Sequence, residues 1–83
     1  MSRPDHVVNM PAWNDFVARY AVGDVLDGVV VSVAPFGAFV RVAGVDGLAP
    51  LTRWPALPAE GATVPVRVDA IDADNHRFSV SPA

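Results

Sequence analysis

Hydrophobic and polar residues alternate over most of the chain, in short runs that are typical of β-strands with one buried face. Gly, Pro, Asp and Asn separate the runs, and these residues favour turns. Val is the most frequent residue, and β-branched side chains favour strands. The pattern therefore predicts an all-β fold with five strands, at residues 24–33, 38–42, 45–51, 63–71 and 77–81.

The alternation also predicts which side chains face the interior. In the second segment Ala38, Val40 and Val42 share one face. Phe39 and Arg41 share the other face. We therefore expect the aliphatic face to be buried, and the aromatic ring and the guanidinium to point outward. By the same rule, the inward residues of the last two segments are Val64, Val66, Val68, Ala70, Phe78 and Val80.

The N-terminal part of the chain follows a different period. Between residues 11 and 20, large hydrophobic side chains recur at the spacing of one helix face: Trp13, Phe16, Val17 and Tyr20. We expect this face to pack on the rest of the domain, although a helix that docks on another chain also fits the pattern. Residues 1–9 show no periodicity and are predicted to form a flexible tail.

The number and spacing of the strands suggest a barrel. Residues 52–61 contain several prolines and are predicted to form a short helical turn and a loop. Five strands within about 60 residues, with this connection between the third and the fourth, suggest a small closed barrel of the OB type. The predicted organisation is an N-terminal tail and amphipathic helix at residues 1–22, followed by the barrel at residues 23–83.

Length and charge limit the functions that fit. The chain has 83 residues, which is enough for one small domain. Its formal net charge is −3, whereas proteins that bind nucleic acids mainly by electrostatics carry strongly basic surfaces. Any contact with RNA must therefore be local. No apolar run approaches the roughly 18 residues that cross a bilayer, and we expect a soluble, cytoplasmic protein with no membrane partner.

The sequence carries none of the motifs expected of an enzyme or a metal site. It has no Cys, which excludes disulfides and thiolate ligands. It shows no Ser-His-Asp arrangement and no Gly-rich phosphate loop. The acidic segment at residues 69–75 resembles the start of a calcium loop, but it lacks the required Gly and Glu and is predicted to form a hairpin turn. We expect no catalysis, no cofactor and no bound metal.

Several short motifs resemble those of the S1-type RNA-binding domain, an OB-fold repeat of a large bacterial ribosomal protein. The resemblance covers residues 22–81 and is most specific in FGAF at 36–39, DGL at 46–48 and RFSVS at 77–81. The helical segment before it resembles the linker helix that precedes such repeats in tandem arrays. The resemblance implies a five-stranded OB-fold barrel that binds RNA.

The resemblance also implies candidate RNA-binding residues on one face of the barrel. Phe36 and Phe39 match the two aromatic residues of the family. Asp72 matches its acidic residue, and Arg77 matches the basic residue that opens the last strand. The family His does not carry over, because this chain has Pro50 in its place.

Aromatic rings and cations on a barrel face are the groups that bind single-stranded nucleic acid. Bases stack on the rings, and Arg41, next to Phe39 by strand parity, joins Arg77 as a candidate phosphate ligand. Two stacked bases contribute roughly 2–6 kcal/mol, and two or three Arg contacts add a salt-dependent contribution. Together they predict dissociation constants between about micromolar and millimolar. We therefore expect a non-catalytic, weak and largely sequence-tolerant module for single-stranded RNA, acting with the ribosome or a larger RNA-processing complex.

A second function fits the same fold. Pro50, the apolar Val29 where the family often has a polar residue, and the acidic net charge are compatible with a barrel that has lost RNA affinity. Such a barrel would be a protein-interaction adaptor. If Trp13 and Trp54 are exposed, they form an apolar protein interface together with Val29 and Val31. Otherwise Trp54 closes the bottom of the barrel.

Overall fold

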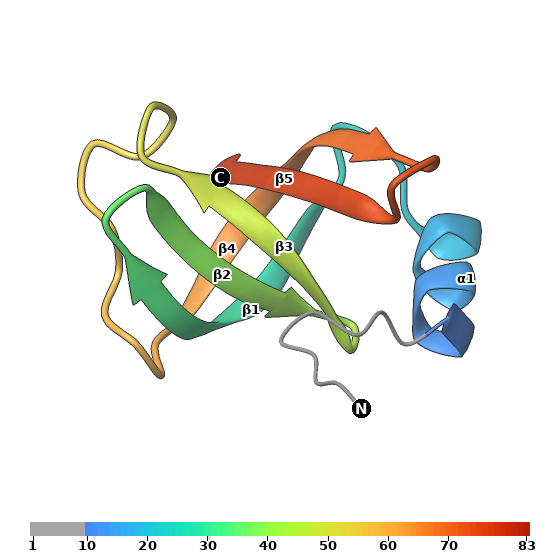
Figure 1. The fold of residues 1–83 in the computed structure, drawn as a ribbon, viewed down its shortest axis with the longest axis horizontal. Helices are drawn as coiled ribbons and strands as arrows, with labels where there is room; N and C mark the ends of the chain where they lie inside the picture. Colours follow the sequence, from blue (N-terminus) through green and yellow to red (C-terminus); the bar gives the residue numbers. More distant parts are fainter. Residues whose placement is uncertain (1–9) are drawn as a thin grey trace.

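The structure of the protein is a computed structural model that describes residues 10–83. These residues form one helix and five strands (Figure 1): α1 (Met10–Arg19), β1 (Val25–Ala34), β2 (Gly37–Val42), β3 (Val45–Pro50), β4 (Thr63–Asp72) and β5 (Arg77–Pro82). Each element agrees with its predicted range to within one residue at either end. Residues 52–61 contain turns and bends, and two consecutive hydrogen bonds, from Arg53 N–H to Pro50 O and from Trp54 N–H to Leu51 O, form a single tight turn where this connection begins. The predicted tail at residues 1–9 lies outside the described residues.

The five strands form a closed barrel in the order β1-β2-β3-β5-β4. Neighbouring strands are antiparallel except β3 and β5, which are parallel and pair at Leu48 and Ser79. Because β4 pairs with β1, every strand has a neighbour on both sides. The arrangement confirms the predicted OB-fold barrel with a short N-terminal helix (Figure 1).

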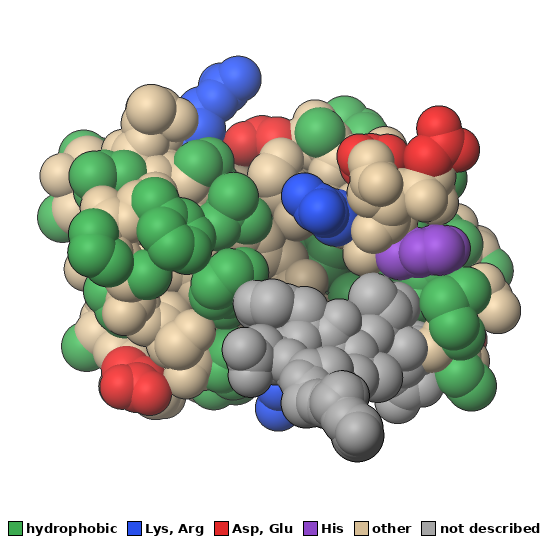
Figure 2. Space-filling model, viewed as in Figure 1, with side chains coloured by type: hydrophobic (Ala, Val, Ile, Leu, Met, Phe, Trp, Pro, Cys, Tyr) green, Lys and Arg blue, Asp and Glu red, His purple; other side chains and the backbone are tan. Residues whose placement is uncertain are grey.

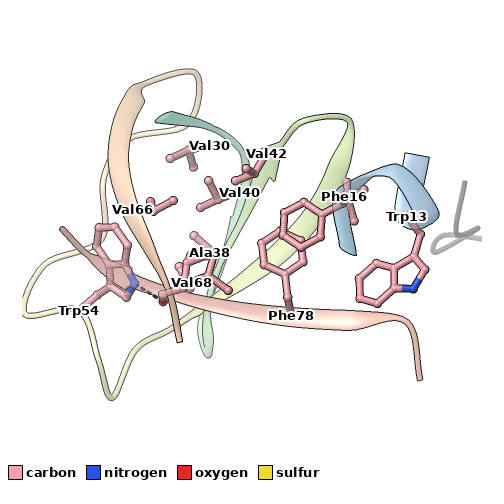
Figure 3. Packing of buried hydrophobic residues seen from close by; sticks show 13 residues of the cluster. Trp13, Phe16, Val30, Ala38, Val40, Val42, Trp54, Val66, Val68 and Phe78 are labelled. Carbon is pink, nitrogen blue, oxygen red and sulfur yellow. Dashed lines mark hydrogen bonds between the residues drawn. The ribbon is translucent and has the colours of Figure 1, made fainter. Parts of the chain in front are cut away.

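Small aliphatic side chains fill the interior of the barrel (Figure 3). Ala38, Val40 and Val42 of β2 are at most 2% exposed, as their alternation predicts. Side chains of this size suit the interior because a barrel of few strands is narrow. The other strands contribute Val30, Val45, Ala49, Val66, Val68 and Val80 to the same core.

Aromatic side chains close the two ends of the barrel (Figure 3). Trp54, in the loop after β3, lies at one end, where its indole N–H donates a hydrogen bond to the carbonyl of Val80 at 2.9 Å. At the other end Phe16 of α1 stacks on Phe78, with ring centroids 4.4 Å apart. Trp13 lies beside Phe16, at a centroid distance of 6.0 Å. The helix therefore packs on the barrel through its aromatic residues, as expected.

The condition for an apolar interface around the two tryptophans is not met, and Trp54 closes one end of the barrel, as the alternative expectation had it. Trp13 is 3% exposed and Trp54 is 6% exposed, so neither forms an apolar surface patch with Val29 and Val31. Both tryptophans are buried because they cover the ends of the barrel. Val29 is 41% exposed and Val31 is partly buried, both on β1. Val17, which the helical spacing places beside Phe16, is exposed because the helix turns that side away from the barrel.

A β-bulge reverses the predicted alternation near the end of β4. The pairing of β4 with β5 shifts between Val68 and Ala70. The extra residue turns Ala70 outward and lets Ile71 pack against the core, so the prediction that Ala70 faces inward is wrong. The same shift brings Asp72 to the outer surface, where it lies opposite Arg77 in the register of β4 and β5.

Gly47 allows the ring of Phe78 to lie directly against β3. A Cβ atom at this position would come within 2.4 Å of the Phe78 ring. The ring has little room to retreat, because Phe16 stacks on it. The absence of a side chain at Gly47 is therefore a packing requirement of the core.

We expect Gly47→Ala to lower the free energy of unfolding by about 1–3 kcal/mol, the usual effect of overpacking a core. Urea unfolding followed by circular dichroism measures the change. In a Phe78→Leu background the same substitution should have a clearly smaller effect, because the clashing ring atoms are absent. An equal effect in both backgrounds would show that the contact with the ring is not the cause.

Candidate nucleic-acid interface

Outward side chains of β2, β3 and β5 form one continuous surface, which we call the β2–β3–β5 face. Strand pairing places Phe39 beside Leu48, and Leu48 beside Ser79. Ser79 in turn pairs with Ala70 of β4. Figure 2 shows hydrophobic side chains gathered over the start of β2 and the end of β3, and a hollow beside a basic side chain near the middle of the view.

Phe36 and Phe39 form the aromatic part of this face. Phe36 lies in the turn between β1 and β2, and it is 58% exposed. Phe39 is half-buried and points outward from β2, because its neighbours Ala38 and Val40 are buried in the core. The two ring centroids are 6.0 Å apart and the ring planes meet at 81°. The rings therefore present two differently oriented flat surfaces.

Hydrophobic residues of β3 and the following loop extend the aromatic pair. The alternation in β3 turns Leu48 and Pro50 outward. Pro50, in place of the family His, pairs with the first residue of β2, directly after Phe36. Leu51 is exposed, and its backbone N–H donates to the carbonyl of Phe36 at 3.1 Å. We call these residues the apolar strip: Phe36, Phe39, Leu48, Pro50 and Leu51.

Arg41 lies on the same side of β2 as Phe39, as strand parity predicts, but its charge is already paired. Asp46 lies opposite Arg41 in β3. Its carboxylate accepts hydrogen bonds from Nε at 2.8 Å and from Nη2 at 3.3 Å. The hydrogen bond and the charge of Asp46 raise the pKa of Arg41 above its usual value. The pair leaves little net charge at this place for a phosphate.

Asp72 and Arg77 face each other where β4 ends and β5 begins. The Asp72 carboxylate accepts hydrogen bonds from the side-chain amide of Asn75 at 2.8 Å and from its backbone N–H at 3.2 Å. These hydrogen bonds, with a smaller contribution from the charge of Arg77, hold the pKa of Asp72 below its usual range. Asp72 is therefore an oriented, ionised acceptor at neutral pH.

Two cations near the apolar strip make no ion pair within residues 10–83. Arg77 is one of them, at the β5 end of the face. The other is Arg53, in the loop after β3, whose backbone N–H donates to the carbonyl of Pro50 at 2.9 Å. Arg53 could not be predicted from the sequence, because a loop has no periodicity that marks its exposed positions. Leu48 was not predicted either, although the alternation of β3 places it on the outer face.

A hollow of about 180 Å³ lies between the apolar strip and the side chains of Asp72 and Arg77. The face brings together four of the predicted site residues, Phe36, Phe39, Asp72 and Arg77. Arg41 lies on the same side of the barrel with its charge engaged by Asp46. The wall of the hollow is formed by Leu48, Ala70, Asp72, Arg77, Phe78 and Ser79.

No helix in residues 10–83 has the length and the apolar character that are needed to span a membrane. In the same residues, no group of three His, Asp or Glu side chains is placed to hold a metal ion. The acidic segment after β4 forms the predicted hairpin turn, which the hydrogen bonds between Asp72 and Asn75 stabilise.

Known proteins resemble this chain over most of its length. The family model of the S1 RNA binding domain matches residues 19–82. The small ribosomal subunit protein bS1 homolog of Bacillus subtilis is 41% identical over 68 residues, which are 72% of this chain and 18% of that protein. The bS1 protein of Mycobacterium leprae is 36% identical over 78 residues, or 83% of this chain and 16% of that protein. The chain thus spans less than a fifth of the length of these relatives.

Solved structures share the fold. GSP13 from Bacillus subtilis matches with a TM-score of 0.67 and 26% identity, over 76% of this chain and 55% of that one. The uncharacterized protein MJ1198 from Methanocaldococcus jannaschii matches with a TM-score of 0.68, over 77% of this chain and 93% of that one, and its 19% identity supports the fold alone. From the family match, the identity to bS1 proteins and the closed barrel, we conclude that the chain belongs to the S1 RNA-binding domain family.

Proposed function

We propose that the chain is a non-catalytic module that binds single-stranded RNA on its β2–β3–β5 face. The S1 domain is in general an RNA-binding module. The observation that carries the proposal is the pair of rings on the outer surface, Phe36 and Phe39, 6.0 Å apart and with Phe36 58% exposed. Unpaired bases stack on such rings with little regard to sequence, because every base has a flat π-face.

The geometry of the two rings favours two stacked bases over one. Planes that meet at 81° cannot both lie parallel to the same base, so each ring takes its own. Each stack contributes roughly 1–3 kcal/mol. Taken as the whole binding energy, two stacks correspond to a dissociation constant between about tens of millimolar and tens of micromolar, and the cost of association weakens this further. The module is therefore weak by itself.

Arg77 and Arg53 are the proposed phosphate contacts. They lie toward opposite ends of the apolar strip, and neither forms a salt bridge with an acid of the described chain, although Asp72 lies opposite Arg77 in the strand pairing. A strand that crosses the strip from one Arg to the other can stack on both rings on its way. Each phosphate contact makes binding more sensitive to salt. On single strands, it adds about −0.7 to the slope of log K against the logarithm of the salt concentration. Arg41 contributes less, because Asp46 holds its guanidinium.

A weak module gains useful affinity when it is joined to other RNA-binding surfaces. The relatives are ribosomal proteins several times longer than this chain. We propose that the module acts on RNA within a larger assembly, such as a ribosome or an RNA-processing complex.

The adaptor function remains the competing hypothesis. Pro50 and the net charge of −3 fit it. The burial of Trp13 and Trp54 counts against it, because these side chains were the main part of the expected protein interface. Of that interface, the exposed Val29 and the partly buried Val31 remain.

Titration of labelled oligo(U) and oligo(A) at low and moderate salt tests the proposal. We expect measurable binding that weakens with salt. Phe36→Ala and Phe39→Ala should each weaken binding by about tenfold, because each removes one stacking surface. Val25→Ala is the matched control: Val25 is 50% exposed and lies where β1 meets β4, across the barrel from β3. It should bind as the unmodified chain does.

Two results would contradict the RNA-binding proposal. One is a folded protein that binds neither oligonucleotide at any salt, which would support the adaptor function. The other is equal weakening by Val25→Ala and by the two Phe substitutions, which would move the contact away from this face.

The ion pair of Arg41 and Asp46 leads to a second prediction. Asp46→Asn should release the guanidinium and add a phosphate contact, since the pair now shares two hydrogen bonds. We expect tighter binding of oligo(U) at low salt and a salt slope that is steeper by about 0.7. Asp27→Asn is the control, because it removes the same charge from an exposed site on the β1–β4 side. The same change of slope in both variants would mean that net charge alone is responsible.

A further inference from the structure

The outward side chains where β1 pairs with β4 form a second surface, across the barrel from β3. Three pairs of opposite residues make up this surface, and all six side chains are exposed. We call it the β1–β4 face: Val25 and Arg67, Asp27 and Pro65, Val29 and Thr63. Val25 is 50% exposed and Val29 is 41% exposed, so aliphatic groups form much of the face.

The two charged side chains of this face, Asp27 and Arg67, lie on a diagonal, one on each strand. Neither makes an ion pair or a side-chain hydrogen bond within residues 10–83. The neighbouring acids are already engaged by their own chain. Asp24 accepts a hydrogen bond from a backbone N–H at 2.9 Å, and Asp69 accepts one from a serine hydroxyl at 2.8 Å.

We propose that the β1–β4 face is the contact surface of a two-fold symmetric dimer, in which Asp27 of each copy pairs with Arg67 of the other. In such a dimer the same patch of both copies meets, so every contact between two different residues occurs twice. The inference does not depend on RNA binding, because the β1–β4 face shares no residue with the β2–β3–β5 face.

The diagonal placement of the charges makes the face complementary to itself. Neighbouring strands lie about 4.8 Å apart, and residues i and i+2 of one strand lie about 6.8 Å apart. On this grid, a two-fold axis along the other diagonal, from Val25 to Pro65, brings Asp27 of one copy to within roughly 3 Å of the position facing Arg67 of the other. Their side chains can span that offset. The same axis sets Val25 and Pro65 against their own counterparts, so apolar groups lie between two ion pairs.

The charges favour a second copy over a partner of one sign. An acidic partner would meet Asp27 as well as Arg67, and a basic partner would meet Arg67 as well as Asp27, so either would face a like charge. A second copy satisfies both charges at once. With six residues per copy instead of the 20–30 of a standard interface, we expect a weak dimer, with a dissociation constant of roughly 0.1–1 mM.

The dimer leaves the β2–β3–β5 face of each copy open, because that face lies on the other side of the barrel. On the proposed function, two joined modules bind one long strand with avidity. A short oligonucleotide contacts one face only. Its affinity per chain is therefore independent of the dimer and of substitutions at Val25 or Asp27.

Sedimentation equilibrium of the full chain without RNA, at concentrations up to about 1 mM, tests the dimer. We expect the average mass to rise toward that of two chains, and to rise less at high salt, which screens exposed charges. Asp27→Lys and Arg67→Glu each place like charges in both contacts, so each should weaken the dimer by at least about tenfold. An equal mixture of the two variants should dimerise again, because each contact then joins opposite charges.

Asp74→Lys is the matched control. It reverses a charge that is exposed in the turn between β4 and β5, away from the β1–β4 face, and it should dimerise as the unmodified chain does. Thermal unfolding followed by circular dichroism shows whether each variant remains folded.

Three results would overturn the proposal. A monomer at every concentration would leave the face to a partner of another kind. A dimer that survives both charge reversals would place the contact on another surface. A mixture of the two variants that stays monomeric would exclude the paired charges. Oligo(U) binding is measured separately, so its absence in a chain that dimerises would contradict the RNA-binding proposal alone.

Discussion

Closure of the barrel is the constraint on which the candidate interface depends. In a closed barrel every strand must turn alternate side chains inward, and the interior here accepts only small aliphatic groups apart from the aromatic ends. Burial of Ala38 and Val40 therefore forces Phe39 to the surface. The alternation of β3 places Leu48 beside it in the same way. The aromatic and apolar character of the face is thus a consequence of how the core is filled.

The charged end of the face depends on an irregularity. Under strict alternation from Val66 and Val68, Asp72 would point into the core, where a lone carboxylate is strongly disfavoured. The bulge in β4 changes which side chains face inward, so that Ile71 packs against the core and Asp72 lies opposite Arg77 on the outer surface. One extra residue thus places the Asp72 carboxylate outside, where it accepts hydrogen bonds from Asn75. The arrangement is local, which explains how a chain with a net charge of −3 can still present a cation beside its aromatic rings.

The sequence predicted the strands, the helix and the inward face of β2, because these follow from periodicity alone. It could not predict the bulge in β4, since no residue type marks it. The burial of Trp13 and Trp54 depends on how the ends of a barrel are covered, which is a property of the assembled fold. The aromatic residues of the site came from the family resemblance. The pairing of Arg41 with Asp46 required the register of β2 and β3.

The contact between α1 and the β4–β5 turn has a consequence for cooperativity. His76 in that turn has a positive φ of 54°, and its ring packs edge-on against Trp13 at a centroid distance of 5.8 Å. The turn that orients Asp72 is thus braced by the helix. Because thermodynamic linkage is reciprocal, whatever stabilises this turn also favours the docked helix, and undocking of the helix destabilises the turn.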